Sequence, residues 1–331
     1  ISCQHADMLD ALTIVKLAAG SLLLFAGGEV LVRGSVSLAQ RLGVSPFLIG
    51  ATVIAFGTSA PELVVSLKAA LDGAMGIALG NIVGSNIANL LLILGMSALI
   101  APVMLNRKAV WRDCLALAGS SLLLTLFVRM GEITRWQGAL MFILLALLIV
   151  YFYWSERRRK TPAGDLHARE EAELQDVPHR ISTALTFIAA GLAAVAFGAH
   201  LLVDAAVVVA RHIGMSEAVI GLTVVAIGSS LPELATAIVA AYRKHADVAL
   251  GNIIGSSVFN VLGILGLVSV IQPIVAPWEI AIVDIWIMLG VTALVLLPVF
   301  AGWRLSRPIG GIFVALYAGF ITVQYVGFLK P

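Results

Sequence analysis

Ten long apolar segments fill most of the 331-residue chain, and only one extended polar stretch, from Ser155 to Arg180, interrupts them. A transmembrane helix needs about 20 apolar residues. The segments that meet this length are 11–40, 46–71, 76–101, 110–129, 136–154, 181–210, 217–242, 247–271, 279–301 and 308–328. Charged residues make up 12% of the chain, against about 25% in soluble domains. The pattern predicts an all-α polytopic membrane protein with ten transmembrane helices.

The polar stretch separates the ten segments into two sets of five. We expect a first five-helix repeat over 1–154, a cytoplasmic linker loop over 155–180 and a second five-helix repeat over 181–331. With the N-terminus outside, cytoplasmic segments hold 15 of the 21 Lys and Arg residues, and the positive-inside rule favours this assignment. The prediction is a multi-pass protein of the cell inner (plasma) membrane, with both termini outside.

The two halves align without gaps when the sequence is shifted by 171 positions. Between 46–102 and 217–273, 26 of 57 pairs are identical, including Pro61-Glu62 with Pro232-Glu233. Because each half has an odd number of helices, the second must enter the membrane in the opposite orientation. Transporters use such inverted repeats, with broken helices and ion sites where the repeats meet near the bilayer centre. The two repeats are therefore expected to be inverted, with helices 2 and 7 broken.

One polar motif lies inside the second apolar segment and recurs in the seventh. Its copies are Gly57-Thr58-Ser59-Ala60-Pro61-Glu62 and Gly228-Ser229-Ser230-Leu231-Pro232-Glu233. A carboxylate at membrane depth costs roughly 2.5–3.5 kcal/mol on insertion scales, and a proline leaves helix carbonyls without their usual partners. A duplicated motif with both features predicts a cation site near the middle of the bilayer.

The helix after each motif carries a second repeated pattern. In the first half Ser85 and Asn89 are four residues apart, on one helix face; Ser256 and Asn260 repeat them. The glycines of this pattern, such as Gly84, are also spaced to permit close helix approach. Serine and threonine often bond to their own helix, so a single such residue indicates little, whereas the duplicated set indicates a site. The candidate metal ligands of this site are all oxygen atoms, which favours Ca²⁺ or Na⁺ over softer metals.

Both patterns, G-[TS]-S-x-P-E and G-N-x-x-G-S-x-x-x-N, are present twice and resemble the α-repeats of the sodium/calcium exchanger (cation/calcium exchanger) superfamily, in its compact prokaryotic branch. The resemblance covers essentially the whole chain. It implies ten helices, an outside N-terminus and four central cation sites. It also implies that Glu62 and Glu233 bind calcium with the carbonyls of Thr58 and Ser229. The sodium ligands that it implies are Thr58, Ser59, Ser85 and the Ala55 carbonyl, with Ser229, Ser230, Ser256 and the Ala226 carbonyl.

In the same resemblance Asn89 and Asn260 line the middle site. Several family members have Asp at one of these two positions, whereas both are Asn here. The departure removes one negative charge, which leaves the coupling stoichiometry open and makes dependence on potassium less expected.

We therefore expect a secondary active antiporter that exchanges Ca²⁺ for Na⁺ by alternating access. The long first and sixth helices would slide across the core, and low pH should inhibit because protons compete for the carboxylates. The alternatives are a Ca²⁺/H⁺ antiporter on the same scaffold and a cation channel. No enzyme motif such as H-E-x-x-H or G-x-S-x-G is present. The expected partners are the lipid bilayer and the transported Ca²⁺ and Na⁺, with no cofactor and no nucleic acid; the oligomeric state is not indicated.

Overall fold

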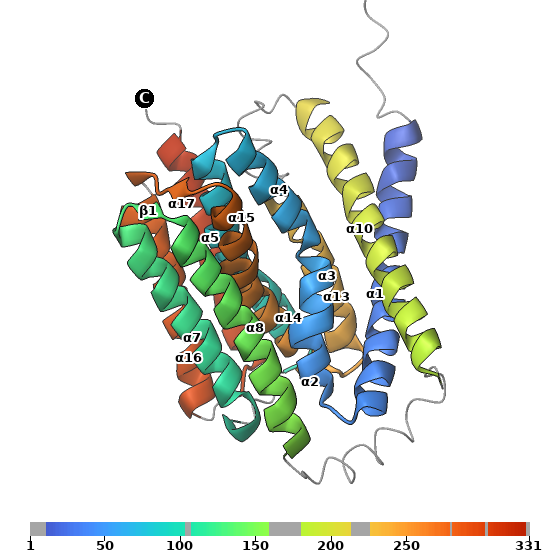
Figure 1. Cartoon of the computed structure of the whole chain (residues 1–331). Helices are drawn as coiled ribbons and strands as arrows, with labels where there is room; N and C mark the ends of the chain where they lie inside the picture. Colours follow the sequence, from blue (N-terminus) through green and yellow to red (C-terminus); the bar gives the residue numbers. More distant parts are fainter. Residues whose placement is uncertain are drawn as a thin grey trace, which may run out of the picture.

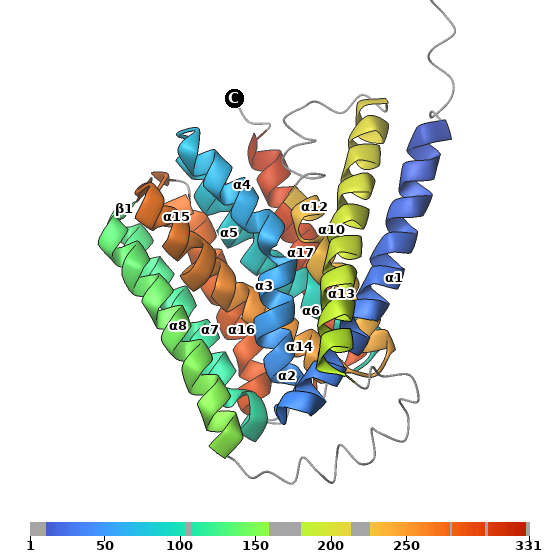
Figure 2. The same ribbon diagram turned by 45° about the vertical axis from the view of Figure 1, so that its right-hand side comes forward.

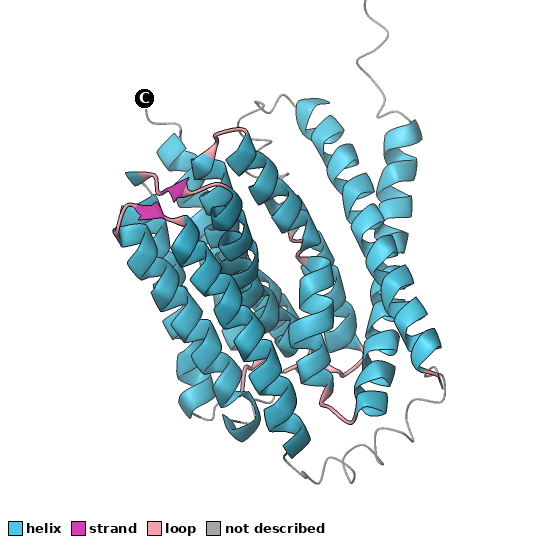
Figure 3. Ribbon diagram, in the orientation of Figure 1, coloured by secondary structure: helices cyan, strands magenta, loops and turns pink. Residues whose placement is uncertain are grey.

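The computed structural model of the chain describes residues 11–102, 107–158, 180–212, 226–278, 280–301 and 304–328. Helices account for nearly all of them (Figures 1 and 3). The first half contains α1 (Ala11–Leu42), α2 (Pro46–Ile49), η1 (Gly50–Ile54), α3 (Ala55–Thr58), α4 (Ala60–Leu71), α5 (Met75–Ala88), η2 (Asn89–Ile93), α6 (Leu94–Ile100), α7 (Arg107–Arg129) and α8 (Arg135–Arg158).

The second half follows a similar order. It contains α10 (Ile181–His212), α12 (Ala226–Ser229), α13 (Leu231–Tyr242), α14 (Ala246–Val258), η4 (Phe259–Leu265), α15 (Gly266–Ile271), η5 (Ile280–Asp284), α16 (Ile285–Ala301) and α17 (Arg307–Phe328). The only strands in the described part are short: β1 (Glu132–Ile133) pairs antiparallel with β2 (Ile274–Val275).

The helices confirm a multi-pass membrane protein. Eight described helical runs are long and apolar enough to cross a membrane, and the bent pair Pro46–Thr58 and Ala60–Leu71 makes a ninth. The predicted segment 217–242 lies partly outside the described residues, which contain its apolar second part, Leu231–Tyr242. Helix α8 runs on to Arg158, four residues past its predicted end, and most of the predicted linker also lies outside the described residues.

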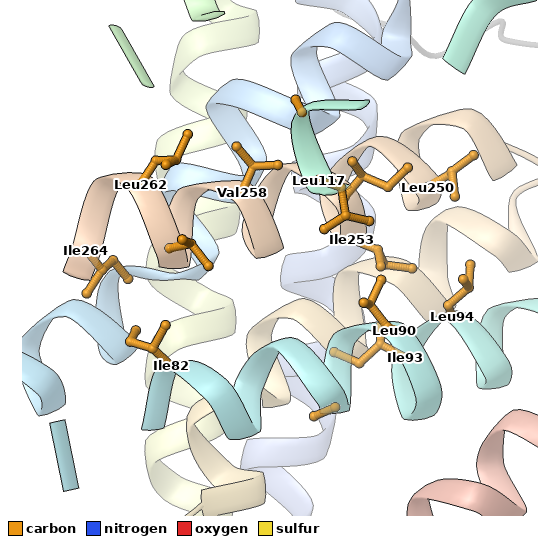
Figure 4. Close-up of a cluster of buried hydrophobic side chains, with 14 of the residues drawn as sticks. Ile82, Leu90, Ile93, Leu94, Leu117, Leu250, Ile253, Val258, Leu262 and Ile264 are labelled. Atoms are coloured by element: carbon orange, nitrogen blue, oxygen red, sulfur yellow. The ribbon is translucent and has the colours of Figure 1, made fainter. Parts of the chain in front are cut away.

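Two helical runs form the centre of the molecule. In Met75–Ile100, 78% of the most apolar window is buried, and in Ala246–Ile271 83% is. In α8 and α17 the buried share is only 17%, so these helices lie at the periphery of the described bundle. Figure 4 shows the packing at the centre, where Leu90 and Ile93 of the first run lie against Ile253 of the second and Leu117 of α7.

Both central runs change from α-helix to π-helix part of the way along, at Asn89–Ile93 and Phe259–Leu265. A third such stretch, Gly50–Ile54, precedes the first motif. A π-turn accommodates extra residues per turn and is frequent at functional sites. These stretches place Asn89 and Asn260 where the helix is locally widened, a feature that hydropathy did not predict.

Helices α1 and α10 form a separate layer beside this core (Figures 1 and 2). Each has 32 residues, as expected for the long first and sixth helices. They run antiparallel and touch through glycines: a Cβ on Gly20 would lie 2.9 Å from the Gly198 carbonyl oxygen, and one on Gly191 would lie 2.7 Å from the Leu31 nitrogen. This backbone contact holds the two helices together as one unit.

Candidate cation site

The first motif breaks its helix at Ser59. The backbone of Ser59 leaves the helical conformation, at φ −84° and ψ 9°, and the two parts of the span are bent by 45°. Pro61 fits in the first turn of α4 because that turn needs no N–H there. Glu62 follows in the same turn, where the helix dipole favours negative charge. The predicted break of helix 2 is confirmed.

The second motif breaks in the same way at Ser230, between α12 and α13. Ser230 has φ −91° and ψ 6°, Pro232 occupies the first turn of α13, and Glu233 follows it. Residues 213–225, which precede α12, lie outside the described residues. Each motif therefore places its glutamate at the start of a helix deep in the apolar core.

Each glutamate accepts a hydrogen bond from the motif of the other half. The Ser59 hydroxyl donates to Glu233 Oε1 at 2.9 Å, and the Ser230 hydroxyl donates to Glu62 Oε1 at 3.3 Å. Thr58 also interacts with the Glu233 carboxylate, and Ser229 with that of Glu62. Both glutamates are 1% exposed, and each accepts its bond from the motif that carries the other. The fold thus joins two carboxylates that are 171 residues apart in sequence.

Four buried oxygens of this region have no hydrogen-bond partner. They are Glu62 Oε2, Glu233 Oε2, Asn89 Oδ1 and Asn260 Oδ1. The ion pairs of the described residues include neither glutamate, so no Lys or Arg in that part of the chain balances their charge. Buried acceptors without donors are costly, and a carboxylate pair with oxygen neighbours suits a hard cation. Across the described ranges no group of three or more His, Cys, Asp and Glu offers another metal site.

Buried asparagines hold the surrounding side chains in place. The Asn252 side-chain oxygen accepts from the hydroxyls of Thr58 and Ser256, each at 3.4 Å. The Asn86 side-chain oxygen accepts from Asn260 Nδ2 at 3.1 Å, and Asn86 Nδ2 donates to the Ser257 carbonyl at 3.2 Å.

The first-half counterpart of Asn252 plays a local role instead. Asn81 Nδ2 donates to the Glu62 carbonyl at 3.2 Å and to the Ser66 hydroxyl at 2.9 Å. Sequence reasoning passed over the three asparagines as site residues. Asn81 and Asn252 belong to the repeated pattern, which could have identified them, whereas Asn86 has no identical counterpart because Ser257 takes its place.

The remaining predicted residues surround this centre. The Ala55 carbonyl accepts from the Ser59 N–H at 3.1 Å and from the Thr58 hydroxyl at 3.5 Å, so it is not as free of helix bonding as the proline suggested. Ser85 and Ser256 are buried on the central runs. Ser229 is half-buried, and Ala226 begins α12.

Glycines allow the second central run to cross the helical segment that precedes the first motif at very short range. A Cβ on Gly251 would lie 2.3 Å from the Phe47 carbonyl oxygen, and one on Gly255 would lie 2.4 Å from Ala51 Cα. No larger residue fits there without a shift of backbone. This contact fixes the distance between the helix that carries Asn252 and Ser256 and the one that carries the first motif.

Comparison with known proteins gives matches over most of the chain. The family model for sodium/calcium exchanger protein matches residues 12–154 and 183–326. The putative antiporter CaxA of Alkalimonas amylolytica is 39% identical, over 93% of this chain and 96% of its own. The sodium/calcium exchanger MaX1 of Methanosarcina acetivorans is 30% identical, over 93% and 97%. A solved structure of the sodium-calcium exchanger NCX_Mj is 30% identical and matches with a TM-score of 0.80, covering 95% of this chain and 99% of that one.

Proposed function

The chain belongs to the sodium/calcium exchanger protein family, and from this we propose that it is a secondary active antiporter that exchanges Ca²⁺ for Na⁺ by alternating access. The observation that carries the proposal is the buried pair Glu62 and Glu233, each with one oxygen that has no donor and no basic partner in the described part of the chain. Two negative charges match one Ca²⁺. The relatives named as sodium/calcium exchangers, MaX1 and NCX_Mj, support sodium as the opposing ion.

Mutual exclusion at the carboxylate pair would couple the two ions. The two carboxylates repel one another, and a bound cation offsets that repulsion. One Ca²⁺ or several Na⁺ supply the compensating charge, but both together would overcompensate it. Sodium would use the neighbouring oxygens of Ser59, Ser85, Ser230 and Ser256, and Asn89 and Asn260 would line the middle. With Asn at both middle positions, the ratio of ions exchanged is left to measurement.

We propose ten helices arranged as two inverted five-helix repeats. In support, residues separated by the repeat distance of 171 touch one another, as residues beside a two-fold axis would. The Asn86 amide bonds to the carbonyl of Ser257, and the Ser121 and Thr292 hydroxyls lie 3.3 Å apart. The hydrogen bonds from Ser59 to Glu233 and from Ser230 to Glu62 are related by the same symmetry, because each joins equivalent residues of opposite halves.

The proposed movement is a sliding of the α1–α10 layer across the core. The glycine contacts between α1 and α10 favour motion of both helices as one body, because neither can move alone without losing backbone packing. We also propose that the termini lie outside and the linker is cytoplasmic, which follows from the distribution of Lys and Arg. A C-terminal reporter enzyme that is active only outside the cytoplasm would test this orientation.

Uptake of radioactive calcium into proteoliposomes tests the function. Vesicles are loaded with sodium or with an impermeant cation at fixed pH, and the unaltered chain is compared with Glu62→Gln and Glu233→Gln. Uptake should require internal sodium, and each variant should lose it while keeping its elution profile in detergent. Glu132→Gln, which alters an exposed glutamate far from the motifs in sequence, is the matched control and should transport normally.

The outcomes separate the alternatives. Calcium uptake that ignores sodium but follows an imposed proton gradient would favour the Ca²⁺/H⁺ antiporter. Calcium flux that does not saturate and needs no counter-ion would favour the channel. Near-normal exchange by a folded Glu62→Gln or Glu233→Gln variant would remove the site assignment.

A further inference from the structure

An ion pair ties the α1–α10 layer to the core at one place. Glu29 of α1 accepts a hydrogen bond from Arg243 Nε at 2.6 Å and another from Arg33 of its own helix. Arg243 directly follows α13, the helix that begins with Leu231 and carries Glu233. Near this pair α1 is tightly packed on α13, since a Cβ on Gly28 would lie 3.0 Å from the Val239 side chain. The contact holds α1 against the site-bearing helix.

The repeat gives each member of this pair a counterpart. Arg243 corresponds to Asp72, and Glu29 corresponds to His200, at the distance of 171 residues. The turns at Asp72 and Arg243 have the same geometry: each backbone N–H bonds to the carbonyl four residues earlier at 2.9 Å, and the next residue has positive φ. Asp72 and Arg243 are therefore equivalent in structure as well as in sequence.

The counterpart contact is not made in this structure. Asp72 is exposed and forms no ion pair within the described residues. The His200 side chain is 67% exposed, and its ionic contact is with Asp204 on its own helix. Helix α10 has no packing against α4 comparable to that of α1 against α13. In Figures 1 and 2 the C-terminal end of α4 stands apart from α10.

The two counterparts have complementary chemistry with the signs reversed. Glu29 is an acid on the sliding layer that meets a base on the core. His200 is a base on the same layer, and its counterpart Asp72 is an acid on the core. One turn away on each helix, Asp204 and Lys68 also carry opposite charges, although Asp204 bonds to Lys16 at 3.2 Å in this structure.

We propose that His200 and Asp72 pair in the opposite access state and hold α10 against α4, in place of the Glu29–Arg243 pair. The inference rests on the proposed alternating access, in which inverted repeats exchange conformations. A contact between the two repeats in one state is then replaced, in the other state, by the contact between the equivalent residues of the opposite repeats. The two pairs are alternatives, so breaking one raises the population of the state that forms the other.

Disulfide trapping tests the pairing. In a Cys3→Ser/Cys114→Ala background, the double variants Asp72→Cys/His200→Cys and Glu29→Cys/Arg243→Cys are oxidised in membranes. Each pair should cross-link, stop calcium uptake and release it on reduction. The matched control, Asp72→Cys/Ala196→Cys, puts the second cysteine one exposed turn earlier on α10 and should cross-link much less. Adding Arg243→Glu should raise the yield of the 72–200 cross-link about fivefold, the factor expected for a partly exposed ion pair.

A charge exchange provides a second measurement if cysteine geometry is unfavourable. Asp72→Lys should slow calcium exchange about threefold or more, and adding His200→Asp should restore the rate. Two results together would overturn the proposal. The first is a 72–200 cross-link whose yield is no higher than that of the 72–196 control, or does not rise with Arg243→Glu. The second is a calcium exchange rate that His200→Asp does not restore in the Asp72→Lys variant. The sodium dependence of calcium uptake is measured on the same vesicles. If the cross-links form and respond as expected but uptake does not require sodium, the sodium coupling is refuted and the proposed pairing is not.

Discussion

Gly255→Ala should disturb the cation site without touching an ion ligand. The added Cβ would lie 2.4 Å from both Ala51 Cα and the Ala51 carbonyl oxygen. Non-bonded carbons prefer about 3.5–4.0 Å, so α14 must move away from η1 by about 1 Å. The atoms that the Cβ would meet belong to the backbone of Ala51, which cannot rotate away as a side chain could.

The size of the effect follows from two opposing quantities. Overpacking of a core costs about 1–3 kcal/mol, and alanine in place of glycine returns up to about 1 kcal/mol of helix propensity. The difference is a net loss of about 0–2 kcal/mol in the free energy of unfolding, and the contact with rigid backbone places the expectation in the upper half of that range. The bond between Thr58 and Asn252 is already 3.4 Å long, so the same shift would break it. A 1 Å misplacement can cost about 100-fold at a reaction site, and we expect the calcium KM to rise at least tenfold.

The assay pairs thermal unfolding in detergent with calcium uptake in sodium-loaded vesicles. Gly119→Ala of α7 is the control, because no described atom outside its own helix backbone lies within 4 Å of the added Cβ; it should keep the calcium KM and have an equal or higher Tm. A Gly255→Ala protein with an unchanged Tm and a KM within twofold would refute the claim that this contact sets the site geometry.

Three further predictions concern other parts of the structure. Asn86→Ala should weaken calcium binding about tenfold, since it leaves the buried Asn260 amide without an acceptor, a loss of about 1–3 kcal/mol; a binding isotherm that is unchanged would contradict this. Acidification should raise the calcium KM and spare the rate at saturating calcium, because protons compete for Glu62 and Glu233; a constant KM with a falling maximal rate would argue against competition. Lys244→Gly should raise the unfolding temperature, because Lys244 has φ 63°, a conformation that costs a non-glycine residue about 1–2 kcal/mol. An equal or lower unfolding temperature would show that the backbone is not strained there.

The broken helix was predictable because its cause is local. Pro61 cannot lie in the interior of a helix without disrupting its bonding but suits a helix start, and the structure breaks the span at Ser59, just before it. The meeting of Ser59 with Glu233 followed from a different kind of information, the repeat. An internal duplication fixes which residues are equivalent, and equivalence constrains how two halves pack.

The features that sequence did not predict depend on contacts between segments. The glycine spacing predicted close helix approach, but it did not predict that Gly255 would meet Ala51, where an added Cβ would lie at 2.4 Å. The π-helical stretch at Asn89 has ordinary hydropathy and is set by the packing around it. Asn86 was missed because its role depends on touching Asn260, which no spacing reveals.

The crossed hydroxyl–carboxylate bonds have a consequence for biosynthesis. Glu62 must receive its bond from Ser230, which lies 168 residues later in the chain. At about 5–20 residues per second, roughly 8–34 s pass between the synthesis of the two. During that interval the second helix carries a carboxylate that lacks its donor, which opposes its release into lipid. The first half is therefore expected to remain beside the insertion machinery, with Glu62 hydrated, until the second motif is made.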